Sequence, residues 1–270
     1  METEFLFKNT DSYDTPADAP VSKLFKLMFR SRWYFYGVNF GVFIRCGECA
    51  RKGLLDKFNQ IHYSNRNFKL IEDCGGRVHL RGLDNLRALN GRPAVLICNH
   101  MSLLETAVIH AFLRPRKDFC FVIKQSLLDV PFFGNIMRKL ECIAVTRSNP
   151  RDDLKVVLEE GEKRLAAGRT VIIFPQSSRS VVFEPEHFNT IGVKLAKRAG
   201  VPILPLALRT DFLANGKLCK DLGPIRRKLP VWFEFGEPIM QVNGTGKDEH
   251  RQIIEFISAR LKEWGSEVRD

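Results

Sequence analysis

The chain has 270 residues, of which 44% are hydrophobic and 27% are charged, so it can bury a large core and is not a disordered chain. The formal net charge of +11 at pH 7 indicates an acidic partner, which could be nucleic acid, an anionic membrane surface or a phosphorylated small substrate. Charge alone does not choose among these three classes.

The N-terminal region divides into two segments of different composition. Residues 1–20 are acidic and polar and lack the apolar core of a secretory signal, so we predict a flexible lead-in there. In segment 21–70, an aromatic-rich apolar run over 33–44 has Lys and Arg on both flanks, and it is shorter than the ~20 residues that span a bilayer. Such a run suits helices that lie in the headgroup region of an anionic membrane. A helical hairpin that only caps the core is the alternative.

Seven cysteines are present, mostly inside apolar runs, as is typical of small core residues in a reducing compartment. Cys46 and Cys49 form a lone C-x-x-C pair, without a second pair or a histidine cluster at ligand spacing. We interpret this pair as part of a helix end and predict no metal site.

From about residue 71 onward, short apolar strands alternate with amphipathic helices. This pattern is typical of an α/β fold with a mostly parallel central sheet flanked by helices, so we predict an α/β domain over 71–270. Gly168 and Gly200 each follow a helical pattern, where a left-handed C-terminal cap is expected. The predicted strands are 77–80, 94–98, 119–123, 142–146, 170–174, 203–207 and 231–235, and the predicted helices are 103–112, 131–140, 151–167, 191–198 and 248–264.

A histidine and a carboxylate lie close together in the segment NHMSLLE at 99–105, directly after the strand predicted over 94–98. The strand delivers His100 to the mouth of a helix, and Glu105 is within reach of the imidazole ring. A histidine with such a partner is typical of a general base whose ring is oriented by a carboxylate. The other five histidines lack a partner at short spacing, and we interpret them as surface or core residues.

Three cationic side chains follow predicted strands closely, namely Lys124, Arg147 and Arg179, the last in the segment FPQSSRS at 174–180. Ligands of parallel sheets bind at the carboxyl ends of the strands, so these cations could converge around one phosphate. The alternative is that each is a solvated charge at a strand end. Three of them at one predicted edge, beside the His100 and Glu105 pair, favour an anion site.

In their order along the chain these motifs resemble those of the glycerolipid acyltransferases, best represented by the bacterial 1-acylglycerol-3-phosphate acyltransferases. The resemblance covers roughly residues 75–240 and rests on the joint order of the blocks, because each block alone is weak. It implies catalysis by His100 and Glu105, and substrate contacts by Asn99, Lys124, Arg147, Ser177, Ser178 and Arg179. The matching blocks are Asn99-His100 with Glu105, Val122-Ile123-Lys124 with Pro131 and Gly134, Cys142 to Arg147, Phe174 to Ser180, and Val201 to Leu206.

The chain departs from the family's pattern at three positions. Glu105 stands where most members have Asp, and its extra methylene can still reach an imidazole. Gln176 and Ser177 replace the family's Glu and Gly, which removes a carboxylate and a flexible residue from the arginine-bearing loop. We therefore expect altered acceptor recognition at this loop, with Arg179 retained as the anion contact.

The resemblance implies direct acyl transfer, without an acyl-enzyme, from acyl-CoA or acyl carrier protein to the hydroxyl of a lysophospholipid, above all 1-acylglycerol-3-phosphate. Neutral His100 would remove the hydroxyl proton while Glu105 holds the ring in the required tautomer. Lys124, Arg147 and Arg179 would hold the acceptor's phosphate. The reaction requires no metal or other cofactor, and we expect a peripheral or monotopic protein at the cytoplasmic face of an anionic membrane.

Other functions are less well supported by the sequence than acyl transfer to a lysophospholipid. A nucleophilic serine at 177–178 lacks the G-x-S-x-G turn that exposes such a residue, and thioester hydrolysis would leave the anion site without a purpose. A nucleic-acid-binding module lacks a recognisable motif, so we expect no nucleic acid partner. An acyltransferase for another lipid acceptor and a catalytically silent lipid-binding protein both stay open, because Glu105 and Gln176 depart from the commonest pattern.

Overall fold

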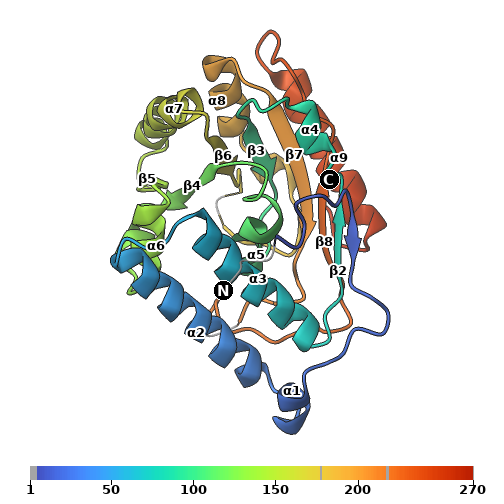
Figure 1. Cartoon of the computed structure of the whole chain (residues 1–270). Helices are drawn as coiled ribbons and strands as arrows, with labels where there is room; N and C mark the ends of the chain where they lie inside the picture. The colour runs from blue at the N-terminus through green and yellow to red at the C-terminus, as the bar shows by residue number, and fades with distance from the viewer. Residues whose placement is uncertain (1–4, 177, 217–218, 270) are drawn as a thin grey trace.

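The computed structural model describes residues 5–176, 178–216 and 219–269. Within them a single mixed sheet of eight strands runs through the molecule, and helices cover it (Figure 1). The strands are β1 (Tyr13–Asp14), β2 (Val78–Arg81), β3 (Val95–Cys98), β4 (Phe119–Lys124), β5 (Ile143–Val145), β6 (Thr170–Ile173), β7 (Ile203–Arg209) and β8 (Val231–Phe235). The helices are α1 (Lys23–Leu27), α2 (Arg32–Arg51), α3 (Lys57–Asp73), α4 (Asn85–Ala88), α5 (Leu104–Phe112), α6 (Phe133–Lys139), α7 (Pro150–Ala166), α8 (Ile191–Ala199) and α9 (Lys247–Glu263), with 3-10 turns η1 (Gln125–Asp129) and η2 (Pro185–His187).

The strand order is β1-β2-β8-β7-β3-β6-β4-β5. From β7 through β3, β6 and β4 to β5 every pairing is parallel, whereas β8 pairs antiparallel with β7 and β1 antiparallel with β2. The predicted α/β fold with a mostly parallel sheet is therefore confirmed. Because these parallel strands point the same way, the segments that follow β3, β4, β5 and β6 leave the sheet at one edge.

Burial explains why the strand pattern was readable in the sequence. All residues of β3, β6 and β7 are buried, as expected for parallel strands covered on both faces. Their continuous apolar runs predicted the strands to within two residues at each end, and the predicted helices agree equally well. Gly168 and Gly200 both have positive φ angles, 80° and 63°, so the predicted left-handed helix caps are confirmed.

The segment predicted to be a flexible lead-in over 1–20 is packed onto the fold wherever the structure describes it. Phe7 is buried, with its ring 4.8 Å from that of Phe68 on α3. Tyr13 and Asp14 add β1 to the sheet, and the Asp14 carboxylate pairs with Arg81 at 2.7 Å. The sequence did not predict this packing, because a short segment with two well-placed aromatic rings can bury them against α3 even though its overall composition is polar.

Helices α2 and α3 form most of the region predicted as helical over 21–70. They pack against each other, α2 also contacts α6, and α3 also contacts α5, so this layer lies over the part of the sheet that carries the site (Figure 1). Gly47 permits the contact of α2 with the α6 end, since a Cβ there would lie 2.5 Å from the carbonyl oxygen of Phe132. In the described part of the chain, no helix has the length and apolar character needed to cross a membrane.

Candidate active site

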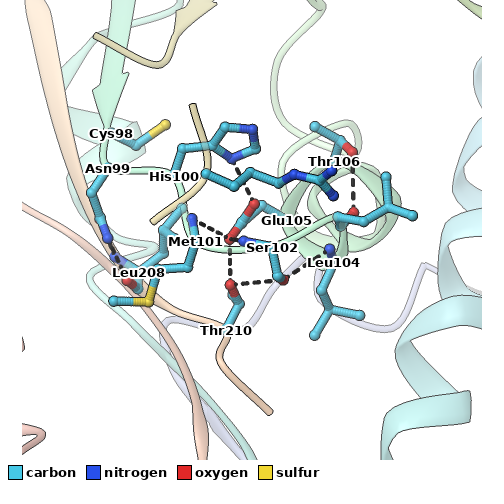
Figure 2. Close-up of polar contacts among 12 residues, drawn as sticks. Cys98, Asn99, His100, Met101, Ser102, Leu104, Glu105, Thr106, Leu208 and Thr210 are labelled. Carbon is cyan, nitrogen blue, oxygen red and sulfur yellow. Dashed lines mark hydrogen bonds and ion pairs between the residues drawn. The ribbon is translucent and has the colours of Figure 1, made fainter. Parts of the chain in front are cut away.

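His100 and Glu105 form a hydrogen-bonded pair at the carboxyl end of β3. His100 Nδ1 lies 2.8 Å from Glu105 Oε2 (Figure 2). Because an ionised carboxylate only accepts hydrogen bonds, this contact assigns the proton to Nδ1 and leaves Nε2 as the basic nitrogen. Nε2 has no hydrogen-bond partner among the described residues, and the His100 side chain is 18% exposed. The pair thus presents an unoccupied basic nitrogen toward solvent.

Glu105 is held in place by the turn that begins α5. Its carboxylate is 1% exposed, and Oε1 accepts hydrogen bonds from the backbone amides of Met101 at 3.0 Å and Ser102 at 2.7 Å. Thr210 Oγ1, just beyond the end of β7, donates to the same oxygen (Figure 2). A buried carboxylate with this many donors has one orientation available, so its second oxygen is fixed toward the imidazole.

The segment 174–180 after β6 holds the His100 peptide from two sides. Gln176 Oε1 accepts from the His100 backbone N–H at 2.7 Å, and the Ser180 backbone N–H donates to the His100 carbonyl at 2.9 Å. The Phe174 ring stacks on the imidazole, with centroids 4.2 Å apart. This loop therefore positions the histidine as well as carrying Arg179.

The Gln176 side chain is buried beside His100. We predicted that its replacement of Glu would alter acceptor recognition, but its side chain is buried and its amide oxygen is bonded to the His100 backbone. The structural reason is that Gln and Glu offer the same acceptor oxygen to an N–H donor. A glutamate at this position could accept the same hydrogen bond, and the expected effect on acceptor recognition stays a prediction.

Gln176→Leu should lower kcat for acyl transfer by about 10-fold or more, since it removes the acceptor of a buried N–H donor and frees the His100 peptide. Gln176→Glu keeps the acceptor and should retain most of the activity. Steady-state kinetics on both variants checks this pair of outcomes. Equal losses in the two variants would show that the hydrogen bond to His100 is not what matters at this position.

Asn99 lies beside His100 in sequence but is turned away from it (Figure 2). Its Nδ2 donates to the Leu208 carbonyl at 2.8 Å, and its Oδ1 accepts from the Leu208 backbone N–H at 2.9 Å. The side chain is buried between β3 and β7. Both polar ends are thus used to join two strands, so the structure gives Asn99 a positioning role in place of the predicted substrate contact.

The three predicted cations follow strands that lie at increasing distance from β3 in the sheet. Arg179 follows β6, the direct neighbour of β3, whereas Lys124 ends β4 and Arg147 follows β5. At ~4.8 Å per strand, β4 lies about 10 Å and β5 about 14 Å from β3. Arg179 is therefore the cation nearest the histidine by topology, and the exposed side chains of Lys124 and Arg147 start farther away.

Two predicted contact residues belong to the loop that carries Arg179. Ser177 lies outside the described residues. Ser178 is exposed and makes no hydrogen bond to His100 within the described part of the chain, which gives no support to a serine nucleophile activated by this histidine.

Sequence reasoning missed Thr210 and the positioning role of Gln176. Thr210 could have been found, because β7 runs parallel to β3 and a polar residue directly after it must lie at the same edge as His100. The amides of His100, Met101 and Ser102 are also occupied, by Gln176 and Glu105. An oxyanion therefore has to be stabilised by other donors than these three.

Comparisons with known proteins show which family the chain belongs to. A family model described as "Acyltransferase" matches residues 77–209. A 1-acyl-sn-glycerol-3-phosphate acyltransferase of Pseudomonas aeruginosa is 38% identical over 195 residues, which cover 72% of this chain and 70% of the relative. The chloroplastic 1-acyl-sn-glycerol-3-phosphate acyltransferase LPAT1 of Arabidopsis thaliana is 28% identical over 142 residues, 53% of this chain and 37% of the relative.

The solved structure of the 1-acyl-sn-glycerophosphate acyltransferase PlsC from Thermotoga maritima shares the fold, with a TM-score of 0.62 at 20% sequence identity, over 89% of this chain and 96% of that one. The chain belongs to the acyltransferase family. It is accordingly an O-acyltransferase, and the resemblance seen in the motifs is confirmed.

Proposed function

We propose that this enzyme transfers a fatty acyl group from a thioester donor, acyl-CoA or acyl carrier protein, to the hydroxyl of a lysophospholipid, above all 1-acylglycerol-3-phosphate. The observation that carries the proposal is the buried Glu105 carboxylate bonded to Nδ1 of His100, which lies beside the Arg179 loop. The relatives from Pseudomonas and Arabidopsis, both named 1-acyl-sn-glycerol-3-phosphate acyltransferases, support the choice of acceptor.

In the proposed reaction, His100 Nε2 takes the proton of the acceptor hydroxyl as its oxygen attacks the thioester carbonyl. Glu105 holds the ring and stabilises the imidazolium that forms. The tetrahedral intermediate collapses with cleavage of the carbon–sulfur bond, and the imidazolium returns its proton to the leaving thiolate. Proton and acyl group are thus both accounted for, and no acyl-enzyme or cofactor enters the sequence.

The anion site of this proposal centres on Arg179, with Lys124 and Arg147 farther along the edge. A charge-assisted hydrogen bond from Arg179 to the acceptor's phosphate is worth about 1.5–3 kcal/mol. The phosphate of 1-acylglycerol-3-phosphate is separated from its free hydroxyl by only a few bonds, so the nearest cation, Arg179, is the one best placed to bind it while the hydroxyl reaches Nε2.

In this proposal the donor's acyl chain lies against the apolar side chains around a small cavity between α2, α3, α5 and α6. Thr106 and Ala107, which follow Glu105 on α5, are among the residues that line it. His110 also lines it, and complete burial holds the pKa of this histidine well below its ordinary value, so the ring stays neutral there. The other lining residues on α2 and α6 are Val42, Phe43, Cys46, Phe133, Ile136 and Met137.

Association with the surface of an anionic membrane, at its cytoplasmic face, completes the proposal. Phe29 is 95% exposed and Leu27 is 74% exposed at the α1 end of the molecule, and basic residues surround them. Exposed apolar side chains with cations around them are typical of a surface that enters the headgroup layer. Further large apolar residues exposed on or beside α1, α2, α3 and α6 are Leu24, Met28, Trp33, Phe40, Ile44, Leu54, Phe58, Val130 and Phe132.

Leu27→Glu should weaken binding to vesicles that contain phosphatidylglycerol by about 10- to 100-fold, because it removes the burial of one leucine side chain and adds a repelled charge. Vesicle co-sedimentation measures this. Val156→Glu is the matched control, since Val156 is an exposed residue on α7, at the opposite end of the molecule from α1 in Figure 1. Equal binding by the Leu27 and Val156 variants would contradict the assigned surface.

The proposed reaction is tested by release of free thiol from acyl-CoA on vesicles, with and without lysophosphatidate, and again with acyl carrier protein as donor. Acceptor-dependent thiol release is expected with at least one donor. Release at the same rate without acceptor would indicate a thioesterase. Release that depends on a different lysolipid would keep the enzyme class and replace the acceptor.

A further inference from the structure

Arg179, the predicted anion contact, already holds an anion. Its Nη2 lies 2.5 Å from Asp221 Oδ1. The Arg179 side chain is only 17% exposed, whereas Asp221 is 52% exposed, so the arginine is enclosed by the site and the carboxylate approaches it from the solvent side. Asp221 lies in the connection between β7 and β8, beyond residues 77–209 that match the family model.

The connection that carries Asp221 is attached on both sides of it. Tyr36 on α2 donates its hydroxyl to the Gly223 carbonyl at 2.8 Å, and burial raises the pKa of Tyr36 to about 12, so this donor stays protonated. Asn215 Nδ2 donates to the Met101 carbonyl, next to the histidine, at 3.1 Å. These two attachments keep the Asp221 carboxylate within reach of the site.

We propose that Asp221 is a specificity-determining residue, which occupies on Arg179 the place that the acceptor's phosphate takes, so that acceptor binding exchanges one anion for another. This inference rests on the proposed function. The ligand class that fits the exchange is a phosphomonoester, because it carries a charge of about −1.5 to −2 at pH 7 and three acceptor oxygens, against one charge on a carboxylate. A lysolipid without phosphate cannot open the ion pair and gains nothing from Arg179.

An exposed carboxylate is a suitable competitor because its ion pair is weak. To bind Arg179, the phosphate has to break only a solvent-accessible ion pair, which contributes little free energy. The more highly charged phosphate then forms shorter, stronger hydrogen bonds with the guanidinium. The Asp221 carboxylate occupies the Arg179 guanidinium when no acceptor is bound. Singly charged or neutral headgroups therefore displace it less readily than a phosphomonoester does.

The test compares wild type with Asp221→Asn and Asp221→Glu in assays of acyl transfer to lysophosphatidate. Asp221→Asn should lower the KM for lysophosphatidate by about two- to fivefold, in line with the range for exposed ion pairs, with kcat little changed. Inorganic phosphate should become a tighter competitive inhibitor by a similar factor. Asp221→Glu retains the charge and should resemble wild type.

Asp248→Asn is the matched control for net charge, because Asp248 is exposed on α9 and pairs with Arg251 at 2.8 Å, away from the site. An unchanged or higher KM in Asp221→Asn, or the same decrease in Asp248→Asn, would overturn the inference while leaving the proposed function intact. If wild type has no lysophosphatidate-dependent activity, the proposed function fails instead. Calorimetric titration of both proteins with inorganic phosphate then still tests the exchange on Arg179. Phosphate should bind more tightly to Asp221→Asn than to wild type, and equal or weaker binding would overturn the inference.

Discussion

His100→Ala should lower acyl transfer to lysophosphatidate by about 10²- to 10⁴-fold, which is the usual contribution of a positioned general base. The variant removes the one nitrogen that can take the hydroxyl proton, while the acceptor and donor sites keep their residues. The imidazole is partly exposed and its ring serves no other hydrogen bond among the described residues, so the fold should persist. Initial rates at saturating substrates, with circular dichroism as a check on folding, measure the effect.

His187→Ala is the matched control for this substitution. His187 also pairs with a glutamate, Glu184, at 3.0 Å, but on the exposed turn η2. The prediction that His187 has no partner at short spacing was therefore wrong, because Glu184 lies only three positions before it. It should keep wild-type activity. A His100→Ala variant that is folded and retains more than about a tenth of the wild-type rate would exclude the histidine as the base.

Glu105→Gln should have the second-largest effect, and it should act mainly on the rate. The amide group can present its NH₂ to His100 Nδ1, which forces the proton onto Nε2 and removes the base; in a serine protease triad the equivalent carboxylate-to-amide change costs about 10⁴-fold. If its oxygen faces Nδ1 instead, the NH₂ opposes the amides of Met101 and Ser102 and leaves buried donors unpaired, which costs about 1–3 kcal/mol of unfolding free energy.

The two effects can be separated with a second buried glutamate. Glu72 is buried on α3, where it accepts hydrogen bonds from Tyr13 at 2.6 Å and from Thr15 at 2.8 Å. Tyr13 belongs to β1, which lies at the far edge of the sheet from β3 with β2, β8 and β7 between them. Glu72→Gln should lose stability and keep its turnover number, whereas Glu105→Gln should lose its turnover. Urea unfolding and kcat on the two variants give the comparison, and equal turnover in both would contradict an orienting role for Glu105.

The fold was readable because its strands are buried on both faces. β3, β6 and β7 are continuous apolar runs bounded by polar turns, and the cap glycines at 168 and 200 mark where helices end. The packing of the described part of the lead-in was not predictable, for the opposite reason. Its order depends on a few side chains, such as Phe7, that find partners on α3, and composition does not register contacts between residues so distant in sequence.

Contacts in the site between residues close in sequence were predictable, whereas contacts between residues far apart in sequence were not. His100 and Glu105 lie five positions apart at the start of one helix, so their contact follows from the spacing. The partners of Asn99, Gln176 and Arg179 lie 109, 76 and 42 positions away. Which of two nearby polar side chains faces a substrate and which one joins two strands is decided by packing between elements, and the motif alone carries no such information.

The central claim is that the acyl group passes directly from the thioester to a lysophosphatidate hydroxyl. The most direct measurement uses acyl-CoA and acyl carrier protein labelled in the acyl carbonyl, with lysophosphatidate on anionic vesicles, and follows the label in lipid, free fatty acid and protein over a single turnover. We expect label in phosphatidate, formed only with acceptor present and absent with His100→Ala. Label in free fatty acid alone, or covalently on the protein before any product appears, would contradict it.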